Sequence, residues 1–581
     1  MSSDSVDVAI IGGGPGGATT AALLKTHRPE LSVAVFEREI FPREHVGESQ
    51  LPPIGDILAE MGCWDRVEAA NFPIKIGATY RWGHSPKLWD FEFVPMEAYR
   101  EEARPRARTE QSRQLAFQVD RAIYDQILLD RARELGCQIH QPAAVRQVLT
   151  DGRRVEALQL QDGRQIRARH YVDASGNAAI LRRAFDVPID LPTKLQNVAF
   201  WDYWENTEWA SRFPGGATRV LVLSIGIGWI WFIPLGPTRT SIGLICPASY
   251  YKSQSRSAAD LYAWALQQEP LIAELTAGAS RENEVRATRD WSFLAQQWYG
   301  DNWMLVGESG GFADPILAAG LTLTHTGARE AAYTLLALDD AVHDRAWLLD
   351  NYQRTQSARI RQHMRFADFW YSANGIFTDL QDYTREIARD AGMEMSAQRA
   401  FQWLATGGFT NDILGQPGIG GLDLAGARQV AMRMVDGQQA WQLSKYNHFR
   451  LNLRNAKVEM IPVYEDGQIR AVRSHVRGQR RLVEHGYFAQ LLTLLRHEHD
   501  LTRLLDQLRA HLFAEGNGYV DDRRLQFLLQ SLEVMVTDGW VEAKLNPKRP
   551  RLELGTPFEG RLIHTNEPLN ARIGALSASG S

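Results

Sequence analysis

The sequence predicts a mixed α/β fold that begins with a parallel sheet and a phosphate-binding turn. An apolar run at residues 6–11 leads directly into a GxGxxG turn and then a helical pattern; the glycines are Gly12, Gly14 and Gly17. A second apolar run at 32–36 ends in Glu37, twenty residues after Gly17. Strand, glycine turn, helix and acid in this order are typical of a Rossmann-like dinucleotide site, where the turn approaches the pyrophosphate and the acid binds ribose.

Composition and charge exclude several classes of protein. The 581 residues suffice for several domains, and a net charge of −5 disfavours general nucleic-acid binding. The three cysteines cannot form a disulfide framework and form no zinc-binding pattern, which indicates a reducing cytoplasm and no metal site. The uncharged segment 220–238 is interrupted by glycines and prolines, so we expect two buried strands there and no membrane helix. No signal peptide is recognisable at the start.

Later segments indicate that the dinucleotide is FAD. Residues 171–176 end a strand with an acid and a turn, residues 303–308 end another with glycine and acid, and a helix follows from about Gly320. This layout resembles the single-component FAD monooxygenases, which implies an FAD-binding part with an inserted substrate-side sheet. It implies FAD contacts from Gly12, Gly14, Gly17, Glu37, Arg38, Arg121, Asp173, Gly176, Asp290, Gly307, Glu308 and Pro315. The group usually has Asp where this chain has Glu308. Asp290 is also a conceivable point of covalent attachment.

One motif narrows the reaction. Residues 229–234 read Trp-Ile-Trp-Phe-Ile-Pro. Two indoles at period two lie on one face of a strand, and Pro234 ends its pairing. Placed beside the flavin, Trp229 and Trp231 could keep an organic substrate away from it. The alternative is that both tryptophans are only core residues.

A second motif places a lysine just before an aromatic strand. Residues 75–83 read Lys-Ile-Gly-Ala-Thr-Tyr-Arg-Trp-Gly. An apolar environment would lower the pKa of Lys75 and favour its neutral amine. The alternative is an ordinary solvated lysine at a strand edge.

The two motifs together resemble the flavin-dependent halogenases, over residues 6 to about 375. The resemblance implies that reduced FAD and dioxygen give a flavin hydroperoxide that oxidises chloride or bromide to hypohalous acid, with the FAD reduced by a separate flavin reductase. It implies that Lys75 receives the hypohalous acid for electrophilic halogenation, by hydrogen bonding or as a haloamine. It also implies a flavin-lining strap at residues 41–49, with Glu48 facing the cofactor, and a halide site at the backbone N–H groups of Ala319 and Gly320.

The residues just before the expected halide site at Ala319 and Gly320 also bear on the choice of substrate. Tryptophan halogenases carry a Glu-Ser pair before the halide-binding residues, and Leu317-Ala318 stand here instead. The lysine motif is similar to that of the branch acting on phenols, pyrroles or acyl groups, often held on an acyl or peptidyl carrier protein. A free small-molecule substrate stays open.

The sequence of the C-terminal third predicts a part of the chain that is separate from the core. We expect a halogenase core at 1–378, a helical or irregular connection at 379–479, a winged-helix-like domain at 480–556 and a flexible tail at 557–581. The third of these has helical patterns at 487–496, 501–513 and 522–536, and a hairpin of residues 540–545 with 551–554. Residues 480–551 carry 11 Lys and Arg against 10 Asp and Glu, which argues against DNA binding. A halogenase of the chloramphenicol pathway has a similar added domain.

Two other functions remain as alternatives. The chain could be an FAD-dependent monooxygenase or reductase whose WxWxIP match is accidental. It could also be a non-enzymatic flavoprotein that binds DNA, which the charge count disfavours.

Overall fold

The computed structural model describes most of the chain. The described residues are 3–372, 418–419, 422–423, 441–551 and 563–579, without the short gaps 83–85, 95, 193–195, 214–215, 290–291, 479 and 516–521. No helix among them is long and apolar enough to cross a membrane.

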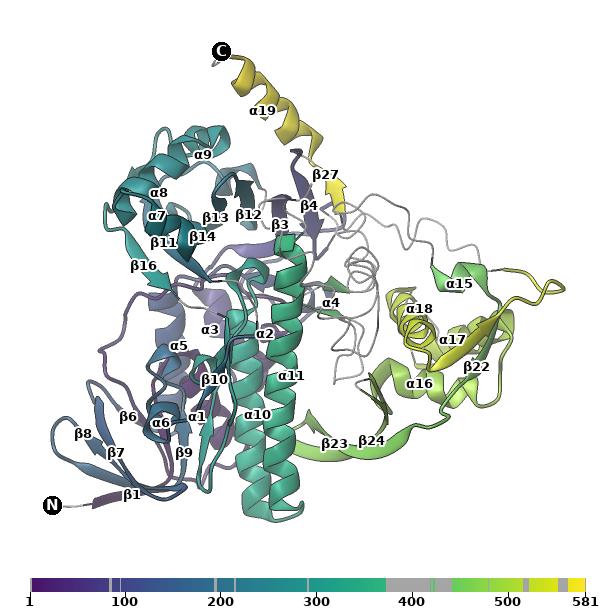
Figure 1. Cartoon of the computed structure of the whole chain (residues 1–581), viewed down its shortest axis with the longest axis horizontal. Helices are drawn as coiled ribbons and strands as arrows, with labels where there is room; N and C mark the ends of the chain where they lie inside the picture. Colours follow the sequence, from purple (N-terminus) through teal and green to yellow (C-terminus); the bar gives the residue numbers. More distant parts are fainter. Residues whose placement is uncertain are drawn as a thin grey trace.

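The N-terminal sheet confirms the predicted dinucleotide-binding layer (Figure 1). Its strand order is β6-β2-β1-β9-β8-β7, with β18 beside β9, and the strands that flank β1 run parallel to it. The strands are β1 (Ser3–Ile11), β2 (Val33–Phe36), β6 (Gln138–His140), β7 (Val145–Asp151), β8 (Arg154–Leu160), β9 (Gln165–Asp173) and β18 (Trp303–Leu305). Their buried residues pack with α1 (Pro15–His27), α5 (Arg121–Glu134), α10 (Gly320–Asp340) and α11 (Arg345–Ser372).

A second, larger sheet forms the substrate side. Its order is β15-β11-β14-β13-β12-β3-β4-β27, with β16 beside β11 and β5 beside β3. The strands are β3 (Ile74–Arg81), β4 (Trp89–Glu92), β5 (Ala116–Phe117), β11 (Asn197–Glu205), β12 (Ala217–Ile225), β13 (Gly228–Pro234), β14 (Arg239–Pro247), β15 (Ser280–Arg281), β16 (Arg286–Arg289) and β27 (Ile563–Thr565). The predicted pair of buried strands at 220–238 is therefore confirmed as β12 and β13.

The two faces of this sheet have different neighbours. Ile230 and Phe232 pack outward against α8 (Ala258–Gln267) and α9 (Pro270–Leu275), beside α7 (Ala248–Ser253). Trp229 and Trp231 face inward with Trp370 of α11. This alternation is the one that period-two patterning predicts. Shorter elements complete the core: α2 (Ile54–Glu60), α3 (Trp64–Ala69), α4 (Glu110–Arg113), α6 (Ile180–Ala184), β10 (Ile189–Asp190), β17 (Phe293–Ala295) and β19 (Gly311–Phe312).

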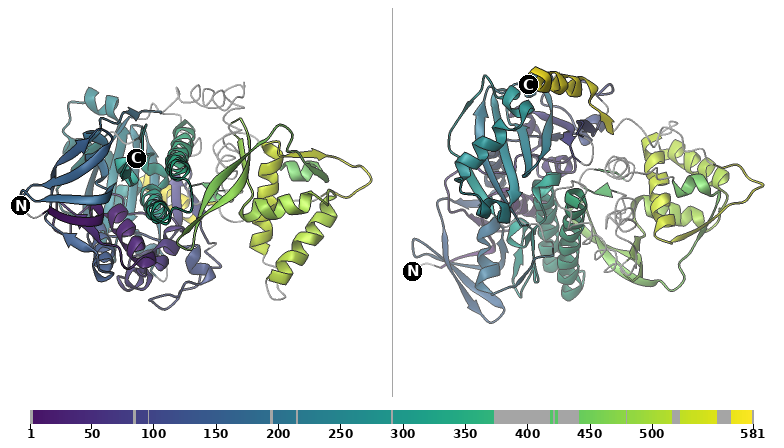
Figure 2. Two further views of the ribbon diagram at one scale, coloured as in Figure 1. Left: turned by 90° about the horizontal axis from the view of Figure 1, so that it is seen from below. Right: turned by 45° about the horizontal axis from the view of Figure 1, so that its top comes forward.

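The C-terminal region lies beside α10 and α11 (Figure 2). It contains α15 (Gln442–Lys445), β22 (His448–Leu451), β23 (Lys457–Glu465), β24 (Gln468–Arg477), β25 (Arg480–Val483), α16 (Gly486–Leu495), α17 (Leu501–Glu515), α18 (Asp522–Thr537) and β26 (Val541–Lys544). The helices lie where the sequence predicts them, but residues 448–477 form strands where a helical or irregular connection was expected. The isolated pairs β20 (Gly418–Ile419) and β21 (Leu422–Asp423) precede it.

Strand pairing crosses the boundary predicted at residue 480. β26 pairs with β22, and β25 pairs with β24, so residues on both sides of 480 share one unit. The hairpin partner predicted for β26 lies at 551–554, of which 552–554 are outside the described residues. The winged-helix assignment thus stays a prediction.

The tail predicted to be flexible is ordered in its described part. β27 pairs with β4 at the edge of the substrate-side sheet, and α19 (Glu567–Ser579) follows near α9 (Figure 1). Asn566 and Asn570 hydrogen-bond to Leu88, and Leu569 is buried. The contacts come from residues 566–570, just before the small, polar residues 571–581 on which the prediction of a flexible tail was based.

Removing residues 563–581 should therefore destabilise the edge of the substrate-side sheet. Burial of Leu569 alone contributes about 2 kcal/mol. We expect faster amide exchange in β4 and a lower melting temperature, measured by hydrogen–deuterium exchange and calorimetry. A chain shortened only by residues 580–581 is the control. Unchanged exchange in β4 would show that the tail does not support it.

Candidate active site

One cavity of about 760 Å³ connects the glycine-rich turn with Lys75. Most residues predicted for the site line it: Gly12, Gly14, Glu37, Arg38, Glu48, Lys75, Arg121, Gly176, Trp229, Trp231, Gly307, Glu308, Pro315 and Gly320. Gly17, Asp173 and Ala319 do not line it, and Asp290 lies outside the described residues. The sequence therefore brings both motifs to a single cavity.

The three glycines of the turn have different tasks. Gly12 has φ +97°, and a Cβ there would lie 2.5 Å from the carbonyl oxygen of Ala174. A Cβ on Gly17 would overlap the carbonyl oxygen of Gly12. Gly14 has φ −66°, and its Cβ would meet only the Arg43 guanidinium at 3.3 Å. Gly12 and Gly17 thus permit the turn itself, and Gly14 keeps the cavity open.

The nucleotide end carries the predicted acid at the end of β2. The Glu37 carboxylate accepts hydrogen bonds from the amides of Gly13 at 2.6 Å and Glu39 at 2.9 Å. This holds the carboxylate at the mouth of the turn, where ribose would lie. The adjacent Arg38 is largely exposed and pairs with Glu39 at 3.1 Å.

Asp173 differs from its predicted role. Its carboxylate accepts from the Ser175 hydroxyl at 2.5 Å and from the Leu181 amide at 2.7 Å. Because it is fully buried and does not line the cavity, it fixes the loop around Gly176 and does not face a ligand. Sequence reasoning could place an acid at this strand end but could not show which way it turns.

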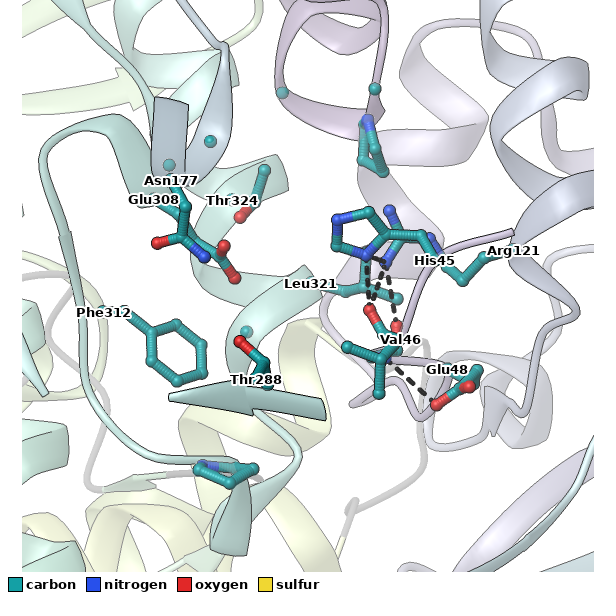
Figure 3. Close-up of a pocket in the computed structure, with 18 of the residues that line it drawn as sticks. His45, Val46, Glu48, Arg121, Asn177, Thr288, Glu308, Phe312, Leu321 and Thr324 are labelled. Carbon is teal, nitrogen blue, oxygen red and sulfur yellow. Dashed lines mark hydrogen bonds between the residues drawn. The ribbon is translucent and has the colours of Figure 1, made fainter. Parts of the chain in front are cut away.

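The flavin end has two sides (Figure 3). On one side lies the strap of residues 41–49. Arg121 pairs with Asp125 through two hydrogen bonds, at 2.7 and 2.9 Å, and donates to the carbonyl oxygens of Val46 and Gly47. Arg121 therefore holds the strap in place.

On the opposite side, Figure 3 shows Asn177, Glu308, Phe312 and Thr324. Burial raises the pKa of Glu308, and the charge of Arg121 partly opposes this. No described residue forms a hydrogen bond with its carboxylate. A carboxylate that faces a cavity and lacks a hydrogen-bond donor suits the hydroxyl groups of a polyhydroxyl chain. The glycine cradle, Glu37 and Glu308 together therefore fit FAD.

The two tryptophans form an aromatic wall beside this end. Their ring centroids are 6.1 Å apart, and both side chains are buried. Trp231 lies over Gly243 of β14, where a Cβ would overlap the indole, and donates to the Ser241 hydroxyl at 3.1 Å. Trp229 donates to the Tyr371 hydroxyl at 2.8 Å.

Tyr371 links the wall to the loop predicted to bind halide. Its hydroxyl donates to Asp314 Oδ1 at 3.2 Å, and that carboxylate caps the following turn through the Ile316 amide at 2.8 Å. Burial raises the pKa of Asp314 to about 7. Ala318 then adopts φ +52°, Ala319 caps α10, and Gly320 begins it. The first amides of a helix have no partner within it, so they remain able to bind an anion.

A β-bulge places Lys75 in the cavity. On β3, Lys75 and Gly77 oppose the adjacent residues Thr218 and Arg219 of β12, so Ile76 is the extra residue. This bulge brings Lys75 to the same face as Ala78 and Tyr80, which simple alternation would forbid. A Cβ on Gly77 would overlap the Phe91 carbonyl oxygen. The glycine in the Lys-x-Gly motif is thus a requirement of this geometry.

The amine of Lys75 is held in an apolar environment. It donates to the Gln50 carbonyl oxygen at 2.9 Å and lies 5.5 Å from the centre of the Phe93 ring. Its side chain is 3% exposed, and burial lowers its pKa to about 7. No described residue offers Lys75 a carboxylate partner. Both the neutral amine and the ammonium are therefore present near neutral pH.

Strand register separates the lysine from the tryptophans. Trp231 pairs with Val222, which pairs with Tyr80, so these residues share one level of the sheet. From that level to Lys75 the strand advances four steps, roughly 13 Å along the strands. The aromatic wall and the lysine therefore lie at different ends of the cavity.

Sequence reasoning missed several contributors to the site. Phe91, Phe93 and Trp370 line the cavity, and the Gln50 carbonyl orients the lysine. Tyr203 and Tyr371 lie behind the catalytic side chains. The alternation of aromatic residues in β4 could have indicated the first two. The others come from segments distant in the sequence, and no local pattern connects them with the motifs.

Known proteins resemble this chain over most of its length. A family model described as tryptophan halogenase matches residues 7–107 and 95–379. A tryptophan 2-halogenase of Chondromyces crocatus is 29% identical over 64% of this chain and 68% of its own. The 1H-pyrrole-2-carbonyl-[peptidyl-carrier protein] chlorinase of Pseudomonas fluorescens is 28% identical over 65% of this chain and 86% of its own.

Solved structures agree. The myxobacterial chondrochloren halogenase CndH, which is FAD-dependent, covers 69% of this chain and 93% of its own, with 27% identity and a TM-score of 0.57. The flavin-dependent halogenase CmlS shares the fold over 95% of this chain and 98% of its own, with 23% identity and a TM-score of 0.68.

Fold and site together define a flavin-dependent halogenase, an enzyme that uses FAD, dioxygen and halide. The chain belongs to the tryptophan halogenase family.

Replacing Gly14 with valine should abolish FAD binding and leave the fold intact. The new side chain would occupy the cradle but meet only the mobile end of Arg43. We expect a colourless, normally folded protein, measured by flavin absorbance and circular dichroism. Gly17→Val is the contrasting variant, because its side chain overlaps backbone and should prevent folding. Full FAD occupancy in Gly14→Val would refute the assignment of the cradle.

Proposed function

We propose that this enzyme halogenates an electron-rich aromatic or activated acyl group held on an acyl or peptidyl carrier protein. The observation that carries the proposal is the single cavity with the glycine cradle and aromatic wall at one end and Lys75 at the other. A separate flavin reductase would supply the reduced FAD. The carrier-bound pyrrole named for two relatives supports this choice of substrate.

The flavin end would bind and shield. Gly14, Glu37 and Glu308 would hold FAD, which with dioxygen supplies the two-electron oxidation of chloride or bromide. The amides of Ala319 and Gly320 would bind the halide at the start of α10. Trp229 and Trp231 would exclude the organic substrate from this end, because two buried indoles close the wall there.

The far end would transfer the halogen. With a pKa of about 7, Lys75 is part ammonium and part amine at neutral pH. The ammonium can donate a hydrogen bond to hypohalous acid and make the halogen more electrophilic. The amine can displace hydroxide from it to give a haloamine. Both routes need the same dry surroundings, which Phe91 and Phe93 provide.

Glu48 would accept a proton in the part of the cavity between the flavin end and Lys75. Its carboxylate is buried, lines the cavity and follows the strap towards Gln50, which holds Lys75. Burial raises the pKa of Glu48, so it exchanges protons more readily near neutral pH than an exposed glutamate does. We assign it the acceptance of a proton at Oε1 or Oε2.

The shape of the cavity supports an aromatic substrate other than tryptophan. Leu317 and Ala318 line it where tryptophan halogenases carry the Glu-Ser pair. Phe91, Phe93 and Trp370 supply flat apolar walls.

Mass spectrometry after incubation with reduced FAD, dioxygen and bromide should show the bromine isotope doublet on a carrier-loaded aromatic acid, and little on the free acid. Equal bromination of both would refute the carrier requirement. A hydroxylated product formed without halide would refute halogenation.

Lys75→Ala should abolish halogenated product and leave FAD binding and flavin reoxidation nearly unchanged, because the lysine lies far from the cradle. Hypohalous acid should then leak and be trapped by an added thioether. Lys75→Met, which keeps the apolar volume, should behave in the same way. Lys75→Arg distinguishes the two routes, because a guanidinium stays protonated: partial activity would favour hydrogen bonding over the haloamine. Near-normal halogenation by Lys75→Ala would refute this assignment.

A further inference from the structure

Tyr203 of β11 lies in an unusual charged setting behind the cavity. Two guanidinium groups lie over its ring, that of Arg239 at 4.2 Å and that of Arg286 at 5.0 Å from the ring centre. The side chain is 3% exposed and does not line the cavity. Two cations in contact with one tyrosine ring restrict its orientation.

The hydroxyl of Tyr203 reaches Glu48, which is the buried acid of the strap and lines the cavity. It donates to Glu48 Oε1 at 3.1 Å, and the amide of Gly47 donates to Oε2 at 3.0 Å. Both oxygens of the carboxylate are thus held, one by the strap and one by the sheet. Burial and the nearby carboxylates of Glu48 and Glu44 keep the pKa of Tyr203 well above its usual range, so the hydroxyl stays a donor at any working pH.

The two arginines also bind the strap directly. Both contact Glu44: Arg239 through Oε1, and Arg286 through Oε2 at 2.6 Å. Glu282 also binds both arginines, and Asp120, which caps α5, binds Arg239. One cluster therefore holds the strap at Glu44 and orients Glu48 four residues later.

We propose that Tyr203 is a positioning residue for Glu48, and that Arg239 and Arg286, which lie over its ring, hold the strap at Glu44 in the position that this orientation requires. Without the hydroxyl, Glu48 would keep its place in the chain but lose the donor that fixes its carboxylate towards the cavity. Without the ring, the arginines would lose their common surface and the strap would loosen. The proposal rests on the function assigned to Glu48 above.

The pH dependence follows from the groups around Glu48. Those that face it are Arg121 of α5, Tyr203 of β11 and, behind Tyr203, Glu44, Arg239 and Arg286. Burial raises the pKa of Glu48, and the hydrogen bond from Tyr203 opposes this by favouring the carboxylate. Removing the hydroxyl therefore raises the pKa of Glu48 further, because the carboxylate loses a donor that favours its charged form. During a titration towards acid, Glu48 of the variant would therefore become protonated at a higher pH than Glu48 of the wild type.

Tyr203→Phe tests the hydroxyl alone, because the ring and its stacking remain. We expect unchanged FAD binding, and an acid limb of the halogenation profile moved up by about one pH unit. The matched control is Tyr262→Phe. Tyr262 is buried on the outer face of the same sheet, where its hydroxyl donates to the Ile242 carbonyl oxygen at 3.0 Å. Its profile should match the wild type. A Tyr203→Phe profile identical to the wild type would overturn the proposal.

A second readout does not depend on halogenation. Infrared titration of the FAD-free protein can follow the protonated carboxyl band that disappears in Glu48→Gln. In Tyr203→Phe this band should appear at a higher pH than in the wild type. If the wild type makes no halogenated product but the band still moves, the proposed function fails and the positioning role stands. An unmoved band overturns the positioning role alone.

Hydrogen–deuterium exchange separates the ring from the hydroxyl. Amides of residues 41–49 should exchange faster in Tyr203→Leu, which removes the stacking surface, and at the wild-type rate in Tyr203→Phe. Glu44→Gln should resemble Tyr203→Leu, because it weakens the same clasp. Wild-type exchange in Tyr203→Leu would overturn the coupling of Tyr203 to the strap.

Discussion

Burial of ionisable groups around one cavity is the constraint on which the arrangement of this enzyme depends. The same burial that lowers the pKa of Lys75 raises those of Glu48, Glu308 and Asp314. Each of the three acids has a specific partner that opposes the shift: Tyr203, Arg121 and the Ile316 amide, respectively. Lys75 has only a neutral carbonyl. Burial therefore shifts the pKa of all four groups, and no charged group in the described part of the chain opposes the shift of Lys75.

The bulky side chains that form the walls of the cavity need space beside them on the sheet. The structure provides that space at glycines. Gly243 accommodates the Trp231 indole, and Gly77 accommodates the Phe91 carbonyl at the bulge that turns Lys75 inward. Both are positions where any side chain would collide with its neighbour. The aromatic motif and the lysine motif are thus each paired with a glycine on the same sheet, which is why the two ends of the cavity can be built from neighbouring strands.

Much of this could be read from the sequence, where local chemistry decides the structure. The turn at Gly12–Gly17 and the alternating indoles of β13 depend only on backbone conformation and strand period, and both were predicted. The bulge at Ile76 could not be, because register is set by the partner strand β12. The inward turn of the Asp173 carboxylate depends on loop amides eight residues away. The strands at 448–477 were missed because charged residues recur along β23 and β24 and interrupt the apolar alternation expected of a strand.

The C-terminal segment shows how far such long-range contacts reach. After β26 the chain returns to the core, where β27 extends the substrate-side sheet beside β4. His564 and Asn566 approach Asp90, whose carboxylate also holds Arg219 and Thr79. Asp90 alternates along β4 with Phe91, and Phe91 lines the cavity near the bulge that presents Lys75. Residues 563–566 therefore support, through a buried ion pair and one edge strand, the position of Phe91 at the end of the cavity where halogen transfer is proposed.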